Sequence, residues 1–190
     1  GLTEMARSGY TEVHDAGVDR ATLAGYQALQ ARGELPIRVY VMLSARDPEL
    51  CREWLQKGPQ GAPADRLIVR SVKAYYDGAL GSRGARLLAP YSDMPGHTGI
   101  SGAGYGFDKE VVAAMMRAGF QVGVHAIGDA GNRETLDFLE GVMQGDARAR
   151  EGRHRIEHAQ IVHPDDQPRF ARSNIIASME PPHAVEDKGW

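Results

Sequence analysis

The sequence has almost no cysteine, with Cys51 standing alone among 190 residues. A single thiol excludes a disulfide within the chain and a metal cluster built from thiolates. Leu50 and Trp54 lie close to Cys51 in a helix-like stretch. We therefore expect this cysteine to pack in or near the core.

Long hydrophobic runs and blocks of like charge are absent as well. The longest strongly apolar stretch, at about 111–116, is far shorter than the ~18 residues of a membrane-spanning helix. The chain has 22 Lys and Arg against 25 Asp and Glu, a formal charge of −3, and neither sign is clustered. These features predict a soluble, cytoplasmic protein that binds neither nucleic acid nor membranes. A targeting signal upstream of Gly1 is the open alternative.

The chain also lacks the length of a complete eight-unit barrel, which takes ~250 residues, although it is long enough for one domain with a substantial core. It begins at Gly1 without an initiator Met and ends at Trp190 within a polar segment. We therefore expect residues 1–190 to form one partial domain of a longer protein.

Apolar runs with β-branched or aromatic residues alternate with helical patterns along the chain. Such alternation is typical of βα units and a parallel sheet, and therefore of an α/β fold. The six predicted strands are 11–14, 37–43, 67–76, 120–125, 155–158 and 175–179. The predicted helices between them cover about 19–32, 47–56, 108–118, 131–144 and 164–173. A doubly wound open sheet is the alternative fold, but no Gly-rich phosphate turn follows the first strand.

One connection is much longer than the others. About thirty residues, from Gly78 to Gly106, are rich in Gly, Pro, Ser and Tyr and precede the next helix. Long connections in compact domains are usually functional loops or disordered segments. A loop that follows a barrel strand lies on the face where active sites are built, so this loop is a candidate part of a site.

Three predicted strands carry a potential metal ligand at or near their C-terminal ends, namely Lys73, His125 and His158. In a closed sheet these side chains would point into the same space above the barrel. Neutral imidazoles bind zinc, iron or nickel well. A lysine ammonium cannot ligate a metal and is costly to bury, but a neutral amine can add carbon dioxide, and the resulting carbamate can bridge two cations.

Each of these residues also has an ordinary structural explanation. A single His at a strand end is often a hydrogen-bonded structural residue, and a strand Lys often reaches solvent or a carboxylate. The ordered set of three makes the two explanations about equal. For His14, His97, His154 and His163 we favour packing, boundary or supporting roles.

The segment VKAYYDGALGSRGA, at 72–85, resembles the fourth-strand motif of the YtcJ-like amidohydrolase family 3 within the amidohydrolase superfamily. Further segments resemble the fifth strand (VHAIGDAGNRETLDFLE), the sixth (RIEHAQIVHPDDQPRF), the seventh (ASMEPPHAVEDKGW) and the second (TEVHDAG). The resemblance covers essentially the whole chain. It implies a TIM (β/α)8 barrel that is incomplete here, with residues 1–190 covering about strands 2 to 7.

The resemblance also implies a site with a divalent metal, zinc in the first instance and one or two ions. Lys73, carbamylated, would be the fourth-strand ligand, and His125 and His158 the ligands from strands five and six. The first-strand His-x-His pair would lie upstream of Gly1, and the catalytic Asp of the eighth strand beyond Trp190. The small β-sandwich that both termini form in this family is expected to be missing too.

The resemblance implies a metal-dependent hydrolase that acts on an amide or related C–N bond of a small molecule. A metal-bound water would be the nucleophile, and the aspartate expected beyond Trp190 would move the proton. Arg83 and His183 are the candidate substrate-binding residues. An ion pair between Arg83 and Asp77 that orders the long loop is the alternative for Arg83.

Two other functions remain open. The chain is either a non-catalytic fragment or pseudo-enzyme that acts as a binding or assembly module, or a barrel with lactonase or phosphotriesterase-like chemistry. The GALGSRGA segment favours the amidohydrolase family over the second of these. Alone, the chain is not expected to be an efficient catalyst, and its exposed sheet edges favour homo-oligomers or aggregation.

Overall fold

A computed structural model describes residues 1–187 as six parallel strands in one sheet. Each strand pairs with its neighbours in chain order, from β1 to β6. The strands are Glu12–Val18 (β1), Arg38–Ser44 (β2), Leu67–Tyr75 (β3), Gln121–Ala126 (β4), Arg155–His158 (β5) and Ile176–Ser178 (β6). All six predicted strands are thereby confirmed. The sequential order excludes the doubly wound alternative, in which the strand order reverses within the sheet.

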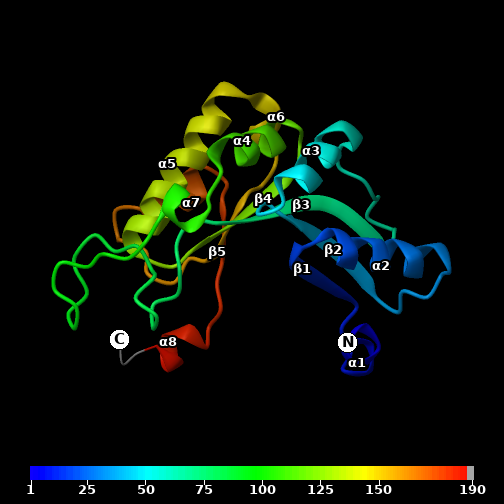
Figure 1. Cartoon of the computed structure of the whole chain (residues 1–190), viewed down its shortest axis with the longest axis horizontal. Helices are drawn as coiled ribbons and strands as arrows, with labels where there is room; N and C mark the ends of the chain where they lie inside the picture. Colours follow the sequence, from blue (N-terminus) through cyan, green and yellow to red (C-terminus); the bar gives the residue numbers. More distant parts are fainter. Residues whose placement is uncertain (188–190) are drawn as a thin grey trace.

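Helices fill the connections between the strands, and α3 to α6 lie along one face of the sheet (Figure 1). The five predicted helices are confirmed as Arg20–Ala31 (α2), Pro48–Lys57 (α3), Lys109–Arg117 (α4), Asp129–Gly145 (α5) and Gln167–Arg172 (α7). Shorter elements are Leu2–Arg7 (α1), Gly102–Tyr105 (η1), Ala147–Arg150 (α6) and His183–Glu186 (α8). The helix α7 is shorter than predicted, because 163–166 forms a turn in which the Asp166 N–H donates to the His163 carbonyl at 2.9 Å.

Three of these helices begin with the same device. Asp19, Asp47 and Asp108 each precede a helix, and each side chain accepts a hydrogen bond from the backbone N–H three residues later, at 2.8–3.0 Å. The carboxylate satisfies an N–H that has no partner within the helix and also favours the positive end of its dipole. Local sequence thus fixes where α2, α3 and α4 start.

The hydrophobic core lies between the helices and one face of the sheet. Side chains alternate along a strand, and on β2 the residues Val39, Val41 and Leu43 are fully buried. They belong to the same cluster as large side chains from α3, α4 and α5 and from the residue just before β4, namely Trp54, Met115, Met116, Leu136, Leu139 and Phe120. Burying each such side chain contributes ~1.5–3 kcal/mol, so this layer holds the helices on the sheet.

The opposite face of the sheet carries polar side chains that contact one another. Arg155 of β5 is central among them, with its Nε 2.7 Å from Oε1 of Glu157 and its Nη2 donating to the Ser178 hydroxyl at 2.9 Å. The Nη1 of the same guanidinium lies 2.8 Å from Nδ1 of His14 on β1. His14 in turn stacks on Tyr40, with ring centroids 4.6 Å apart.

The contact between His14 and Arg155 shows that the sheet is curved. In a flat sheet β1 and β5 would be four strand spacings, roughly 19 Å, apart, which is beyond the reach of these two side chains. Curvature brings their side chains together across the concave face. The sheet is therefore a six-stranded half-barrel, consistent with an incomplete TIM-like barrel.

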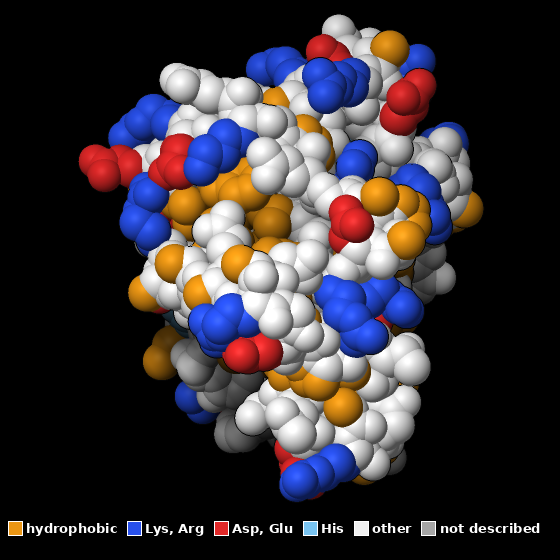
Figure 2. Space-filling view, turned by 90° about the vertical axis from the view of Figure 1, so that its right-hand side faces the viewer, with side chains coloured by type: hydrophobic (Ala, Val, Ile, Leu, Met, Phe, Trp, Pro, Cys, Tyr) orange, Lys and Arg blue, Asp and Glu red, His pale blue; other side chains and the backbone are white. Residues whose placement is uncertain are grey.

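The surface carries both charges in mixture. Figure 2, which views the side of the molecule with α2 and β1, shows basic and acidic side chains interspersed among neutral and hydrophobic ones. Within the described residues, no helix combines the length and the apolar character that crossing a membrane requires. The last three residues of the segment that resembles the seventh strand, 188–190, lie outside the described residues.

We predict that Arg155→Met lowers the free energy of unfolding by about 2–4 kcal/mol, because it leaves the nearly buried Glu157 carboxylate without its partner. Arg38→Met is the matched control, since its pair with Glu12 is more exposed and is expected to contribute less than about 1 kcal/mol. Urea unfolding followed by circular dichroism measures both. Equal losses would show that the Arg155 network does not stabilise the curved sheet.

Candidate metal centre

Lys73, His125 and His158 lie on three adjacent strands, β3, β4 and β5. The register pairs Tyr75 with His125 and Ala126 with His158, so the two histidines lie at the C-terminal ends of their strands and Lys73 two residues below the level of His125. The rings of His125 and His158 form a T-shaped pair with centroids 4.5 Å apart. The structure therefore brings the two predicted histidine ligands into contact.

Lys73 lies within the same end of the sheet and is only 5% exposed. Its Nζ is 4.1 Å from the ring centroid of Tyr75 and has no hydrogen-bond partner among the described residues. Burial lowers the pKa of Lys73 from 10.5 to about 8, against the opposing charge of Glu157. A buried amine without a partner is costly as an ammonium, so this position makes the neutral amine more accessible than in an ordinary lysine.

The two histidines are held in the form that binds metals. Burial, followed by the charges of Lys73 and His158, lowers the pKa of His125 to about 3. Burial also lowers the pKa of His158, although the Glu180 carboxylate acts in the opposite direction. Both imidazoles are therefore neutral at physiological pH, as a metal ligand requires. A divalent cation fits this donor set of one orphaned amine and two neutral imidazoles.

Asp77 connects the site to the long loop. Its fully buried carboxylate accepts hydrogen bonds from the backbone N–H groups of Arg86, Ile127 and Gly128, each at 2.9 Å. Burial raises the pKa of Asp77 to about 6, against these backbone hydrogen bonds. Oδ1 is also 3.5 Å from Nε2 of His125, without hydrogen-bond geometry. One side chain thus holds the loop, the end of β4 and the start of α5 together.

Two glycines make room for this junction. A Cβ on Gly128 would lie 1.9 Å from the Arg86 carbonyl oxygen, and a Cβ on Gly131 would lie 2.4 Å from Oδ2 of Asp77. Neither approach is possible for a residue with a side chain. The GDAG sequence at 128–131 is therefore required for the loop to pack on the first turn of α5.

The predicted ion pair between Arg83 and Asp77 is wrong. Arg83 instead pairs with Asp93, its Nε donating at 3.0 Å, and its carbonyl oxygen lies 2.8 Å from Nε2 of His97. Asp77 is unavailable because backbone N–H groups occupy its buried oxygens. Among the described residues Arg83 makes no hydrogen bond or ion pair with the predicted ligands, so its contacts order the loop.

His183, the other predicted substrate residue, does lie at the site. It begins α8, and its ring centroid is 5.6 Å from that of His158. Glu180, which sequence reasoning missed, lies between them: Oε1 is 2.9 Å from Nδ1 of His158 and Oε2 is 3.1 Å from Nε2 of His183. The EPPH sequence at 180–183, a carboxylate three residues before a histidine, is the signal that could have identified Glu180.

His154 and His163 have contacts of the packing and surface kinds expected for them. His154 is fully buried, with its Nδ1 accepting from the Val122 N–H at 3.0 Å and its Nε2 2.7 Å from the Ala149 carbonyl oxygen. His163 is near the surface beside Asp165, 3.6 Å away. These contacts account for His154 and His163 without a metal or substrate bound to them.

Two hollows lie at opposite ends of the strands. One of about 440 Å³ is lined by His158, Glu180 and His183 together with Leu80 and Met179, at the C-terminal ends where active sites of βα barrels are built.

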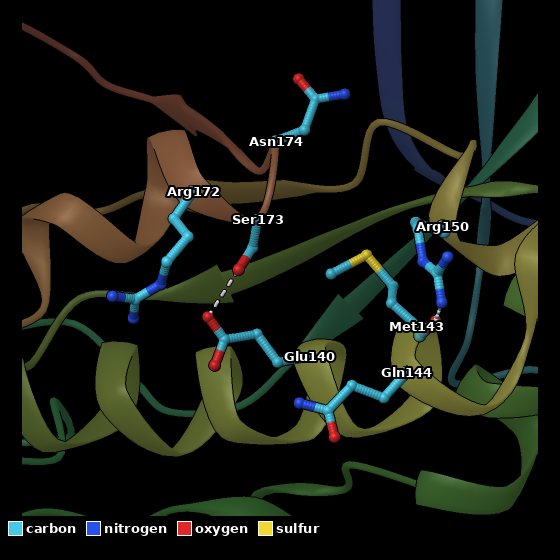
Figure 3. A pocket seen from close by; sticks show the side chains of 7 residues that line it. All are labelled: Glu140, Met143, Gln144, Arg150, Arg172, Ser173 and Asn174. Atoms are coloured by element: carbon cyan, nitrogen blue, oxygen red, sulfur yellow. Dashed lines mark hydrogen bonds between the residues drawn. The ribbon is translucent and has the colours of Figure 1, made fainter.

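The other hollow, of about 620 Å³, lies between the second half of α5 and the segment that leads into β6 (Figure 3). Its wall includes Glu140, which accepts a hydrogen bond from Ser173 at 2.7 Å. Because it lies at the N-terminal end of β6 and contains none of the predicted ligands, we assign the site to the smaller hollow.

A family model and two known proteins resemble this chain in sequence. A family model described as the amidohydrolase family matches residues 1–190. The chain is 37% identical over 133 residues to Protein LONG AFTER FAR-RED 3 of Arabidopsis thaliana. The matched region is 70% of this chain and 22% of that protein. It is 29% identical over 173 residues to the putative amidohydrolase YtcJ of Bacillus subtilis (strain 168), covering 88% and 30% respectively.

Two solved structures have the same fold. An uncharacterized metal-dependent hydrolase from Pyrococcus furiosus superposes with a TM-score of 0.83 at 30% identity, over 98% of this chain and 37% of that one. A metal-dependent hydrolase from Pyrococcus horikoshii OT3 gives 0.82 at 27% identity, over 98% and 36%. The chain thus spans about a third or less of the relatives it matches.

We predict that Lys73→Met stabilises the metal-free chain at pH 7 by about 3 kcal/mol. The folded pKa of Lys73 lies near 8, below the ordinary 10.5, and each pKa unit corresponds to ~1.36 kcal/mol. The unfolded chain binds the Lys73 proton more tightly than the folded chain does. The loss of folding stability that Lys73 causes is therefore complete below pH 8 and disappears as the pH rises towards 10.5.

Chemical unfolding in EDTA and bicarbonate-free buffer, at pH 7 and near pH 10, measures this effect. Lys57→Met, at an exposed position, is the control and should be nearly neutral. A Lys73→Met chain that is no more stable than wild type at pH 7 would contradict the burial cost.

We predict that Asp77→Ala lowers the free energy of unfolding by roughly 2–4 kcal/mol, because three buried N–H groups lose their acceptor. Hydrogen exchange should accelerate at Arg86, Ile127 and Gly128, and limited proteolysis should cut the long loop faster. Asp93→Ala removes the exposed pair with Arg83 and should leave those three amides protected. Unchanged exchange in Asp77→Ala would exclude the proposed junction.

Proposed function

This chain belongs to the amidohydrolase family, and on that basis we propose that it supplies part of the metal centre of a hydrolase that cleaves an amide or related C–N bond of a small molecule. The six strands would be the second to seventh of a (β/α)8 barrel. The observation that carries this proposal is the buried Lys73 amine, without a partner, beside two neutral histidines at the ends of adjacent strands.

Lys73, His125 and His158 would hold the cation, for which zinc is our proposal, as one ion or two. A zinc ion lowers the pKa of a bound water and polarises the carbonyl under attack. The chain's own contribution begins at Lys73, whose low pKa makes the neutral amine available near pH 8. That amine would add to carbon dioxide and release a proton, giving a carbamate with two oxygen ligands.

The surrounding residues would keep the ligands in place. Asp77 fixes the backbone just after the His125 strand end through Ile127 and Gly128, while burial lowers the pKa of both histidines and favours their neutral form. The proton acceptor that the family resemblance implies is an aspartate outside this sequence. Because the chain covers only 22–37% of its relatives, turnover is proposed for the longer protein.

We expect the 190-residue chain to bind zinc at about one ion per chain or more, and Lys73→Ala and His125→Ala to weaken this binding. The loss should exceed the roughly 10–100-fold that changes in outer-shell partners cause. Mass spectrometry of metal content after dialysis, on protein without an affinity tag, measures the effect, and His163→Ala is the control on an exposed histidine. Wild-type zinc affinity in Lys73→Ala would refute the proposed ligand.

A second measurement addresses the bond type. The full-length protein, loaded with zinc, should release an amine from N-acyl or N-formyl amides, and Lys73→Ala should abolish the release. Hydrolysis of lactones or phosphotriesters in place of amides would replace the C–N assignment while leaving the metal ligands intact.

A further inference from the structure

His158, Glu180 and His183 form a compact group of potential ligands at the C-terminal end of the sheet. They come from the end of β5, the segment after β6 and the first residue of α8. One ligand atom from each residue lies within 4.8 Å of the other two. The group is formed by residues within 158–183 alone, so it is complete in the described chain.

The spacing of these atoms suits a transition-metal cation. Zinc bonds to nitrogen and oxygen of about 2.0–2.2 Å at tetrahedral angles separate the ligand atoms by roughly 3.4 Å. Oε1 of Glu180 is 2.9 Å from Nδ1 of His158, and Oε2 is 3.1 Å from Nε2 of His183. The two contacts use different oxygens of the one carboxylate, so Glu180 faces both imidazole nitrogens at distances close to this spacing.

The donor types and their surroundings also fit. Two imidazoles and one carboxylate, with at least one open position, are a donor set that zinc uses in catalytic sites. The histidine side chains are 22% and 23% exposed and Glu180 is 53% exposed, which leaves a path for an ion. The adjoining hollow of about 440 Å³ has Leu80 and Met179 in its wall, and such apolar neighbours strengthen charge interactions inside it.

We propose that His158 Nδ1, Glu180 and His183 Nε2 bind a divalent cation of the zinc class, at a position separate from that of Lys73 and His125. The proposal does not rest on the hydrolase function. His158 is common to both positions, but an imidazole has two ring nitrogens, and each position has two ligands that the other lacks. The open coordination position would accept a small carboxylate or amide oxygen from the hollow.

The two positions can be separated by titrating the untagged 190-residue chain with Co²⁺ and recording the visible absorption of the bound ion. Glu180→Gln and His183→Ala should each remove one absorbing Co²⁺ and weaken that site more than about 100-fold, beyond what outer-shell changes cause. Lys73→Ala and His125→Ala should retain it. His163→Ala, which alters an exposed His–Asp pair without a third ligand, should behave as wild type.

Several outcomes would overturn this inference. Wild-type Co²⁺ binding in both Glu180→Gln and His183→Ala would exclude the group as a site. Loss of all binding in each of the four ligand variants would indicate one shared site in place of two positions. Loss in Lys73→Ala and His125→Ala alone would support the proposed hydrolase centre and refute this site.

Circular dichroism and thermal unfolding distinguish ligand loss from misfolding. His183 and Glu180 lie outside the hydrophobic core, so both variants should unfold at the wild-type temperature in EDTA. Glu180→Asp provides a conservative comparison, because it keeps a carboxylate and should retain weakened Co²⁺ binding. No binding in Glu180→Asp but full binding in Glu180→Gln would contradict a carboxylate ligand.

Discussion

The contact of Arg155 with His14 across the concave face is the constraint on which the rest of the structure depends. It joins strands that are four places apart in the sheet and, through Ser178, reaches the last strand as well. Barrel interiors are usually filled with branched apolar side chains, whereas this one is held by charge-assisted hydrogen bonds. The curvature makes the C-terminal ends of β3, β4 and β5 converge. The candidate ligands at these ends therefore lie on the same side of the sheet as the polar contacts that hold it curved.

Much of the fold could be predicted from local patterns, because the spacing of apolar residues that marks a strand or a helix involves only residues close together in the sequence. The strands that carry Lys73, His125 and His158 are predicted by apolar runs, and the structure shows that three helices begin at an aspartate whose hydrogen bond spans three residues. Family resemblance named the three candidate ligands, and the structure places them on adjacent strands, although their role as ligands stays a prediction.

What could not be predicted depends on contacts between distant segments. Glu180 gains significance only because α8 turns back to bring His183 to His158. The sequence offers Asp77 as an ion-pair partner of Arg83, but in the structure its oxygens accept from backbone N–H groups 9, 50 and 51 residues away. Neither the contacts of Glu180 nor those of Asp77 produce a periodic pattern in the sequence. A buried carboxylate that accepts backbone hydrogen bonds also cannot be distinguished by sequence from one that binds a cation.

Lys73 and Asp77 lie four residues apart at the end of β3 and have opposite effects on stability. Both are buried, and burial moves their pKa values towards neutrality from opposite directions, to about 8 and about 6. Such displaced values are frequent at functional sites. The buried Lys73 amine costs stability, so a fold selected only for stability would place an apolar residue there, whereas the Asp77 carboxylate stabilises the fold through its three backbone hydrogen bonds.

The junction at Asp77 has a consequence for how the loop and the centre communicate. Because one carboxylate holds the 78–106 segment and also borders His125, the order of the loop and the orientation of that imidazole are thermodynamically linked. Linkage is reciprocal, so in the proposed centre any change in ion affinity that loop order causes at His125 would be matched by an equal change in loop stability when the ion binds. The 78–106 segment would then act on the proposed centre through the Asp77 carboxylate without contributing a ligand to it.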